Sequence, residues 1–174
     1  IFTLLRRSLP GRGFGRLYAL NYSPFTDDIA DVAARLRTLI EEVCEQTGYE
    51  RVHIIGHSMG GLIARYYVQR LAGDVHVHTI VTLGSPHGGT VPARFAVWPV
   101  IRQMRTDGGI VTELAEPAPG CRTRFVAIWS DLDQLVLPSG GIATAADVAA
   151  CRDAGCDGAV VGKALANRFG WKVG

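Results

Sequence analysis

The sequence of 174 residues has little cysteine and no excess of charge of one sign. Its 18 basic residues nearly balance its 16 acidic residues and are scattered, which excludes the basic surface typical of nucleic-acid-binding proteins. No apolar run approaches the roughly 18 residues that a membrane-spanning helix requires. The cysteines form no Cys-x-x-Cys pair and have no histidine at zinc-like spacing. We therefore expect free thiols and no metal site, and a Cys151–Cys156 or longer-range disulfide is the alternative.

The first residues, IFTLLRRSLPGRGFG, include no initiator methionine and lack the layout of a signal peptide. We interpret the sequence as one that starts inside a longer chain. The compartment is therefore unknown: the composition is that of a soluble protein, either cytoplasmic or secreted. The length suits one domain with a real core.

Short apolar runs alternate with amphipathic stretches, which predicts an α/β fold with a parallel sheet and helices on both of its faces. The predicted strands are Arg16–Leu20, Arg51–Gly56, Val77–Gly84 and Arg124–Ser130. A long helix is expected after Thr26 and Asp27, which can cap it, and before Gly48. A second helix is expected over Met59–Leu71. The Gly- and Pro-rich stretch 85–120 is expected to carry a cap or substrate-facing loop.

The pentapeptide Gly56-His57-Ser58-Met59-Gly60 matches the G-x-S-x-G pattern of a nucleophile elbow. Its turn from strand to helix is so tight that side chains two positions on either side of the serine would collide, and glycine removes both collisions. The apolar strand before it and the helical stretch after it supply the context that this motif requires. Ser58 is therefore the predicted nucleophile, and an incidental serine on a Gly-rich turn is the alternative.

Three stretches together resemble an α/β-hydrolase of the bacterial lipase and esterase type: GHSMGG, VTLGSPHGGT and WSDLDQLVLP. The resemblance covers residues 1–138. It implies cleavage of carboxylic esters through an acyl-enzyme, an ester or lipid substrate and no cofactor.

The resemblance also assigns roles to individual residues. The resemblance makes Asp133 the acid of the triad, with Asp131 as the second candidate. It makes the Met59 N–H one of the two donors to the oxyanion. His57 occupies a position in the elbow that is commonly a non-catalytic histidine in lipases. A solvated acidic turn is the alternative for the two aspartates.

Two parts of the catalytic machinery are missing from this pattern. All five histidines precede Asp133, whereas the general base should follow it. His87 is a weak substitute base, and a loop-structuring role is the favoured alternative for it. The second oxyanion donor belongs to a loop expected before Ile1, and losing one donor typically costs about a hundredfold or more in rate. We therefore expect an N-terminally truncated core with impaired activity.

The tail 139–174 differs in character and resembles the last two strands of a phosphate-binding TIM barrel, of the phosphoribosyl isomerase or indole-glycerol-phosphate synthase type. Residues that match phosphate-binding positions of those barrels are Ser139, Gly140, Gly141, Gly162 and Lys163. The favoured alternative is a strand–helix–strand–helix unit that packs on the same sheet, so that the whole chain forms one domain. The change near LPSG suggests a chimera produced by fusion, rearrangement or engineering.

Two other functions remain open at this stage. The chain could be a non-catalytic module that binds an acyl chain or a partner through the elbow edge and the segment VPARFAVWPVI, or its tail could bind phosphate. Self-association through an exposed sheet edge is a further expectation, because an unpaired edge can pair with another chain.

Overall fold

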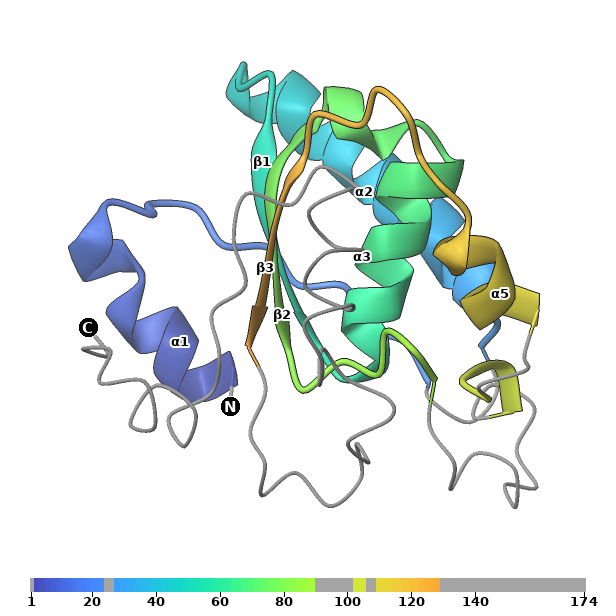
Figure 1. The fold of residues 1–174 in the computed structure, drawn as a ribbon. Coiled ribbons are helices and arrows are strands. Elements are labelled where there is room, and N and C mark those ends of the chain that lie inside the picture. Colours follow the sequence, from blue (N-terminus) through green and yellow to red (C-terminus); the bar gives the residue numbers. More distant parts are fainter. Residues whose placement is uncertain (1, 24–26, 90–101, 106–108, 129–174) are drawn as a thin grey trace, which may run out of the picture.

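The computed structural model describes residues 2–23, 27–89, 102–105 and 109–128. The strands β1 (Val52–His57), β2 (Val77–Leu83) and β3 (Arg124–Ile128) form one parallel sheet in the order β1-β2-β3 (Figure 1). In the register of the sheet, Ile55 pairs with Val81 and Val81 pairs with Val126. Three of the four predicted strands are therefore confirmed within the described part of the chain. Residues 129 and 130 of the last one lie outside it.

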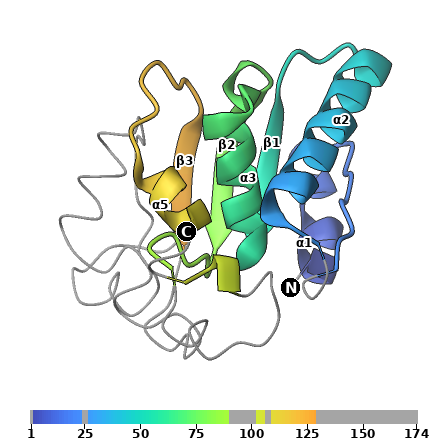
Figure 2. The same ribbon diagram turned by 90° about the vertical axis from the view of Figure 1, so that its right-hand side faces the viewer.

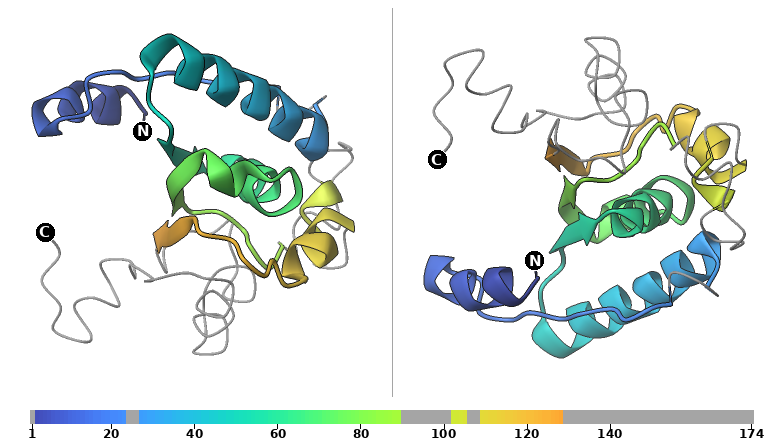
Figure 3. Two further views of the ribbon diagram at one scale, coloured as in Figure 1. Left: turned by 90° about the horizontal axis from the view of Figure 1, so that it is seen from above. Right: turned by 90° about the horizontal axis from the view of Figure 1, so that it is seen from below.

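The helices form layers beside the sheet. The long helix α2 (Ile29–Thr47), the helix α3 (Met59–Arg70) and the short α5 (Gly109–Ala115) lie on one side, with α3 between the other two (Figures 2 and 3). The helix α1 (Phe2–Ser8) lies on the other side of the sheet (Figure 1). Two 3₁₀ turns, η1 (Pro10–Arg12) and η2 (Gly73–Val75), follow α1 and α3. The predicted α/β fold, with helices on both sides of a parallel sheet, is confirmed.

The core lies between the sheet and the two long helices. Its fully buried members include Ile29, Val32, Leu62, Ile63, Tyr67, Val77 and Ile80. Each such apolar side chain contributes roughly 1.5–3 kcal/mol relative to exposure. The core therefore fixes α3 on the sheet, and with it the turn at which α3 begins.

The ends of α2 differ in part from the prediction. Asp28 is the N-cap, and its side chain accepts a hydrogen bond of 2.8 Å from the Ala30 N–H. Asp27, one of the two predicted caps, instead accepts a hydrogen bond of 3.0 Å from Arg35, and Thr26 lies outside the described residues. The C-terminal end is as predicted, because Gly48 takes the left-handed conformation with φ 73°.

The predicted strand Arg16–Leu20 is wrong, because this segment is irregular and outside the sheet. Leu20 packs against the core, and the Phe14 ring meets the His53 ring edge-on with centroids 5.7 Å apart. A short apolar run indicates a segment that packs on the core, but a strand also requires a hydrogen-bonded neighbour. Here the inward contacts form without one.

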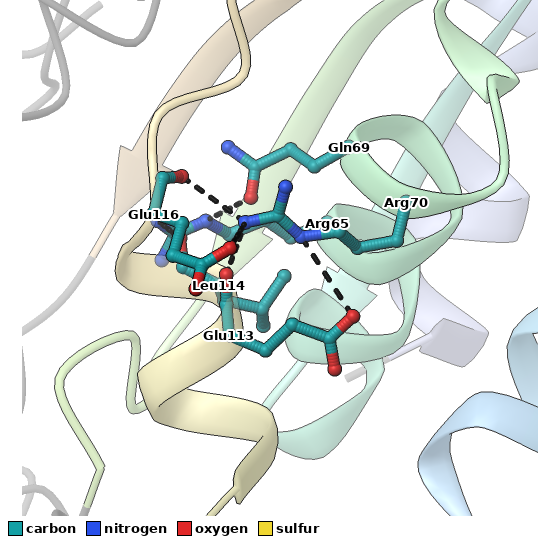
Figure 4. Close-up of polar contacts among 6 residues, drawn as sticks. All are labelled: Arg65, Gln69, Arg70, Glu113, Leu114 and Glu116. Carbon is teal, nitrogen blue, oxygen red and sulfur yellow. Dashed lines mark hydrogen bonds and ion pairs between the residues drawn. The ribbon is translucent and has the colours of Figure 1, made fainter.

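Two arginines of α3 hold α5 in place (Figure 4). Arg65 donates to the Leu114 carbonyl at 2.6 Å, and Arg70 donates to the carbonyls of Glu113 and Glu116. The last carbonyls of a helix have no partners within it, so cations are stabilising there. Polar contacts therefore join α5, which lies within the stretch 85–120 expected to carry a cap or substrate-facing loop, to α3.

None of the helices in the described ranges is long and apolar enough to cross a membrane. Cys44 and Cys121 form no disulfide within the part of the chain that the structure describes. Cys151 and Cys156, the segment 91–101 and the whole tail 139–174 lie outside the described residues.

Candidate active site

Ser58 lies on the turn between β1 and α3 and has the backbone angles φ 52° and ψ −123°. A positive φ at a non-glycine residue costs on the order of 1–3 kcal/mol and persists only where the surroundings enforce it. The Ser58 N–H donates to the Leu83 carbonyl at 2.9 Å, which extends the hydrogen bonding of the sheet into the turn. The side chain makes no capping hydrogen bond to α3, so the hydroxyl is not used to stabilise the helix.

The glycines around Ser58 are required by close backbone approach. A Cβ on Gly56 would lie 2.7 Å from backbone atoms of Gly60 and Gly61. A Cβ on Gly60 would lie 3.1 Å from the Tyr22 hydroxyl, which is tighter than an ordinary contact. The first predicted collision is therefore severe and lies within the turn, whereas the second involves a side chain from the segment before α2.

Met59 is the first residue of α3, and it is buried. Its N–H has no intrahelical acceptor at that position, and the N-terminus of the helix carries partial positive charge. Such a donor can stabilise an oxyanion that forms next to the Ser58 hydroxyl.

A buried polar group lies behind the elbow, on the turn after β2. His87 Nε2 is 3.0 Å from Thr82 Oγ1, and the His87 N–H donates to the Ser85 carbonyl. His87 Nδ1 and Ser85 Oγ are buried without a hydrogen-bond partner among the described residues. Burial, and secondarily the charge of Arg65, lowers the pKa of His87 to about 3. These contacts favour the loop-structuring alternative for His87.

The structure brings no imidazole to the Ser58 hydroxyl within the described ranges. His57 is exposed at the end of β1, and His87 is bonded to Thr82. The other histidines lie near the opposite end of the sheet. His53, for example, precedes Ser58 by five residues along β1, which is about 16 Å at the rise of a strand.

Several predicted site residues lie outside the described residues. These are the two aspartates of the acid prediction, Asp131 and Asp133, and the tail residues Ser139, Gly140, Gly141, Gly162 and Lys163. Among the residues that are described, no group of three or more histidine, cysteine or carboxylate side chains could hold a metal ion.

Sequence reasoning missed two contributions to the elbow. A Cβ on Gly61 would lie 2.7 Å from Ser85 Cβ and 2.9 Å from Thr82 Cγ2, so this glycine lets α3 approach the end of β2. The doubled glycine of MGG was a signal for this approach. Tyr22 also reaches Gly60 from a distant segment, and no local pattern indicates that contact.

Comparison with known proteins agrees with this geometry. Triacylglycerol lipases of Pseudarthrobacter phenanthrenivorans and Burkholderia plantarii are each 35% identical to the chain over 82 residues, which is 46% of this chain. The matches cover 25% and 22% of those lipases, so the chain spans about a quarter of their length.

Similarity of fold extends further than similarity of sequence. The monoacylglycerol lipase of Paleococcus ferrophilus is similar in structure with a TM-score of 0.53 and 11% identity, over 82% of this chain and 72% of that one. The model of the palmitoyl protein thioesterase family matches residues 3–116, which is more than half of the chain. The chain therefore belongs to the palmitoyl protein thioesterase family, and its fold is that of the α/β-hydrolases of the lipase and esterase type.

Proposed function

We propose that this chain is a serine hydrolase of carboxylic esters or thioesters in which Ser58 is the nucleophile. The single observation that carries the proposal is the backbone of Ser58, with its positive φ on a turn that has no room for a Cβ at position 56. Strained residues of this kind concentrate at functional sites. Family membership and the two lipase relatives support the same reaction class.

In the proposed reaction, Ser58 Oγ attacks the acyl carbonyl carbon and its proton passes to a base. The oxyanion is stabilised by the Met59 N–H, and the alcohol or thiol leaves as the acyl-enzyme forms. Water then hydrolyses the acyl-enzyme. Asp133 is the proposed carboxylate that orients the base.

The base is the missing component of this proposal. The sequence has no histidine after His87, and the low pKa and Thr82 contact of His87 make it a poor proton acceptor for Ser58. A serine hydroxyl without an adjacent base is a weak nucleophile. We therefore propose that the 174 residues hydrolyse esters slowly.

The test is hydrolysis of p-nitrophenyl esters and an acyl thioester, with and without added imidazole. We expect a slow rate that depends on Ser58 and that imidazole increases, because it replaces the missing base in solution. Imidazole hydrolyses p-nitrophenyl esters by itself, so the rate of a protein-free blank at the same imidazole concentration is subtracted. After this subtraction the Ser58→Ala control should show neither the rate nor the increase. A rate that is equal in the wild-type and Ser58→Ala chains would overturn the role of Ser58. A Ser58-dependent rate that imidazole leaves unchanged would instead show that a base is already present.

The non-catalytic alternative has its own expected result. Saturable binding of a fatty acid, together with no Ser58-dependent turnover in the presence of imidazole, would favour a binding module. Phosphate binding by the tail would appear as an increase in Tm with inorganic phosphate that Lys163→Met abolishes.

A further inference from the structure

Two histidines lie side by side on neighbouring strands, away from the elbow. The register between β1 and β2 shifts between Val52 and His53, so that Val52 pairs with Val77 while His53 pairs with Thr79. The shift leaves His78 as an extra residue at the edge of the ladder, and bulges re-aim side chains in this way. The His53 and His78 rings have centroids 5.0 Å apart and planes inclined by 57°.

Both rings have nitrogen atoms available. His53 and His78 are exposed, and the His53 ring has no hydrogen bond within the part of the chain that the structure describes. His78 Nδ1 lies 2.7 Å from Thr79 Oγ1, which leaves Nε2 free. Metal-binding histidines usually donate their second ring N–H to such an acceptor, because this fixes the tautomer and the ring orientation.

We propose that His53 and His78 form a two-imidazole site for a divalent transition-metal cation of the zinc, nickel or copper class. Two imidazole nitrogens that bind one Zn²⁺ at ~2.1 Å with a roughly tetrahedral angle place their ring centres about 5 Å apart. The observed separation of the ring centroids is 5.0 Å, so the spacing of the two rings suits such a site. Water completes the coordination sphere, since no third protein ligand is grouped with them among the described residues.

Charges near the two histidines affect both the pKa of His53 and the attraction of a cation. Burial first, and then the neighbouring His78 and Arg51, lowers the pKa of His53. The Arg51 guanidinium also repels a cation, but it is engaged by the carbonyls of Asp74 and Val77. Imidazole is a preferred ligand of zinc, copper and nickel, whereas calcium and magnesium select oxygen ligands.

The sequence predicted no metal site because its search rested on local spacing. His53 and His78 are far apart in the chain, and the pairing of β1 with β2 in the parallel sheet brings them together. The site lies near the end of the sheet opposite to Ser58 and is independent of the proposed hydrolase activity.

The test is isothermal titration of the full 174-residue chain with Zn²⁺ and with Ni²⁺, combined with ¹H–¹⁵N spectra of the histidine side chains. We expect saturable binding, and metal-dependent shifts of the His53 and His78 ring nitrogens. His53→Gln and His78→Gln should each weaken binding by about a hundredfold, because the second ligand then no longer acts intramolecularly. Thr79→Val should weaken it by about tenfold, because it removes only the acceptor that orients His78.

His76→Gln is the matched control, since His76 lies on the turn just before β2 and its Nδ1 is 3.4 Å from the Glu50 carbonyl. It should leave the affinity unchanged. Absence of heat and of ring shifts with both metals would overturn the proposal. Binding that persists in both His53→Gln and His78→Gln would also overturn it and would assign the metal to other groups, such as cysteine thiols. Circular dichroism of each variant tests whether it is folded, and His53 and His78 are exposed positions at which a substitution is expected to be tolerated.

Discussion

The individual residues of the elbow carry the clearest link from sequence to function. The sequence predicted a strained serine between two glycines, and Ser58 has a positive φ while Gly56 has no room for a side chain. This much was predictable because the constraint is local and steric. The Tyr22 contact with Gly60 was not predictable, because it joins segments that no short-range pattern relates.

The backbone of Gly60 and Gly61 lies so close to Gly56 that adding a methyl group at Gly56 should cost much stability. Gly56→Ala should lower the free energy of unfolding by about 1–3 kcal/mol, since its Cβ would overlap backbone rather than a flexible side chain. Urea unfolding monitored by circular dichroism measures the change. Gly15→Ala is the matched control, because a Cβ there meets nothing within 4 Å and its stability should be unaltered. Equal effects of the two substitutions would contradict the tight turn.

The His87 imidazole, which is half-buried with its Nδ1 atom out of contact with solvent, predicts sensitivity to acid. Burial, together with Arg65, lowers its pKa to about 3, whereas an unfolded histidine has a pKa of about 6.5. Between these values the unfolded chain binds a proton that the folded chain does not. His87 therefore stabilises the fold less as the pH falls from 6.5 toward 3, with a slope approaching 1.4 kcal/mol per pH unit, about one proton.

The control for this prediction is His87→Gln, which does not titrate and whose side-chain amide can still reach Thr82. Unfolding curves collected from pH 7 to pH 4 should be less pH-dependent in the variant. If both chains lose stability in parallel, the acid sensitivity arises from other groups.

At the scale of elements, the periodicity of apolar residues predicted where most helices and strands lie. It predicted less well which residue caps a helix and which elements contact one another. The helices α2 and α3 and the three strands follow from periodicity, but the α2 cap is Asp28 rather than Thr26 or Asp27. The segment Arg16–Leu20 has a strand-like pattern and no strand partner. The arginine contacts between α3 and α5 depend on packing across many residues of sequence.

These contacts predict an unequal response to two arginine substitutions. Arg70→Met should destabilise the fold by about 1.5–3 kcal/mol, because the α5 carbonyls lose a charged donor. Arg37→Met should leave stability nearly unchanged, since Arg37 makes an exposed pair with Glu41 on α2 that solvent screens. Thermal unfolding of both variants decides the matter, and a smaller loss for Arg70→Met than for Arg37→Met would refute the anchoring role.

At the scale of the whole molecule, the described part contains the strand–turn–helix unit that carries Ser58, with two further strands and the helices that pack beside the sheet. The fold class was predictable because alternating strands and helices leave few arrangements for a parallel sheet. The acid and the base of the triad were less predictable than the fold class, because the residues of a triad come from loops that are distant in sequence. The roles of Asp133 and of the tail, and the expected self-association at a sheet edge, stay predictions.

The most direct measurement is mass spectrometry of the chain after reaction with a fluorophosphonate probe, with Ser58→Ala as the control. The account predicts a single slow adduct on the peptide that contains Ser58, formed faster with imidazole and absent from the variant. No adduct on Ser58 in a folded sample with imidazole present, or the same adducts in both chains, would contradict the claim that this elbow holds a nucleophile.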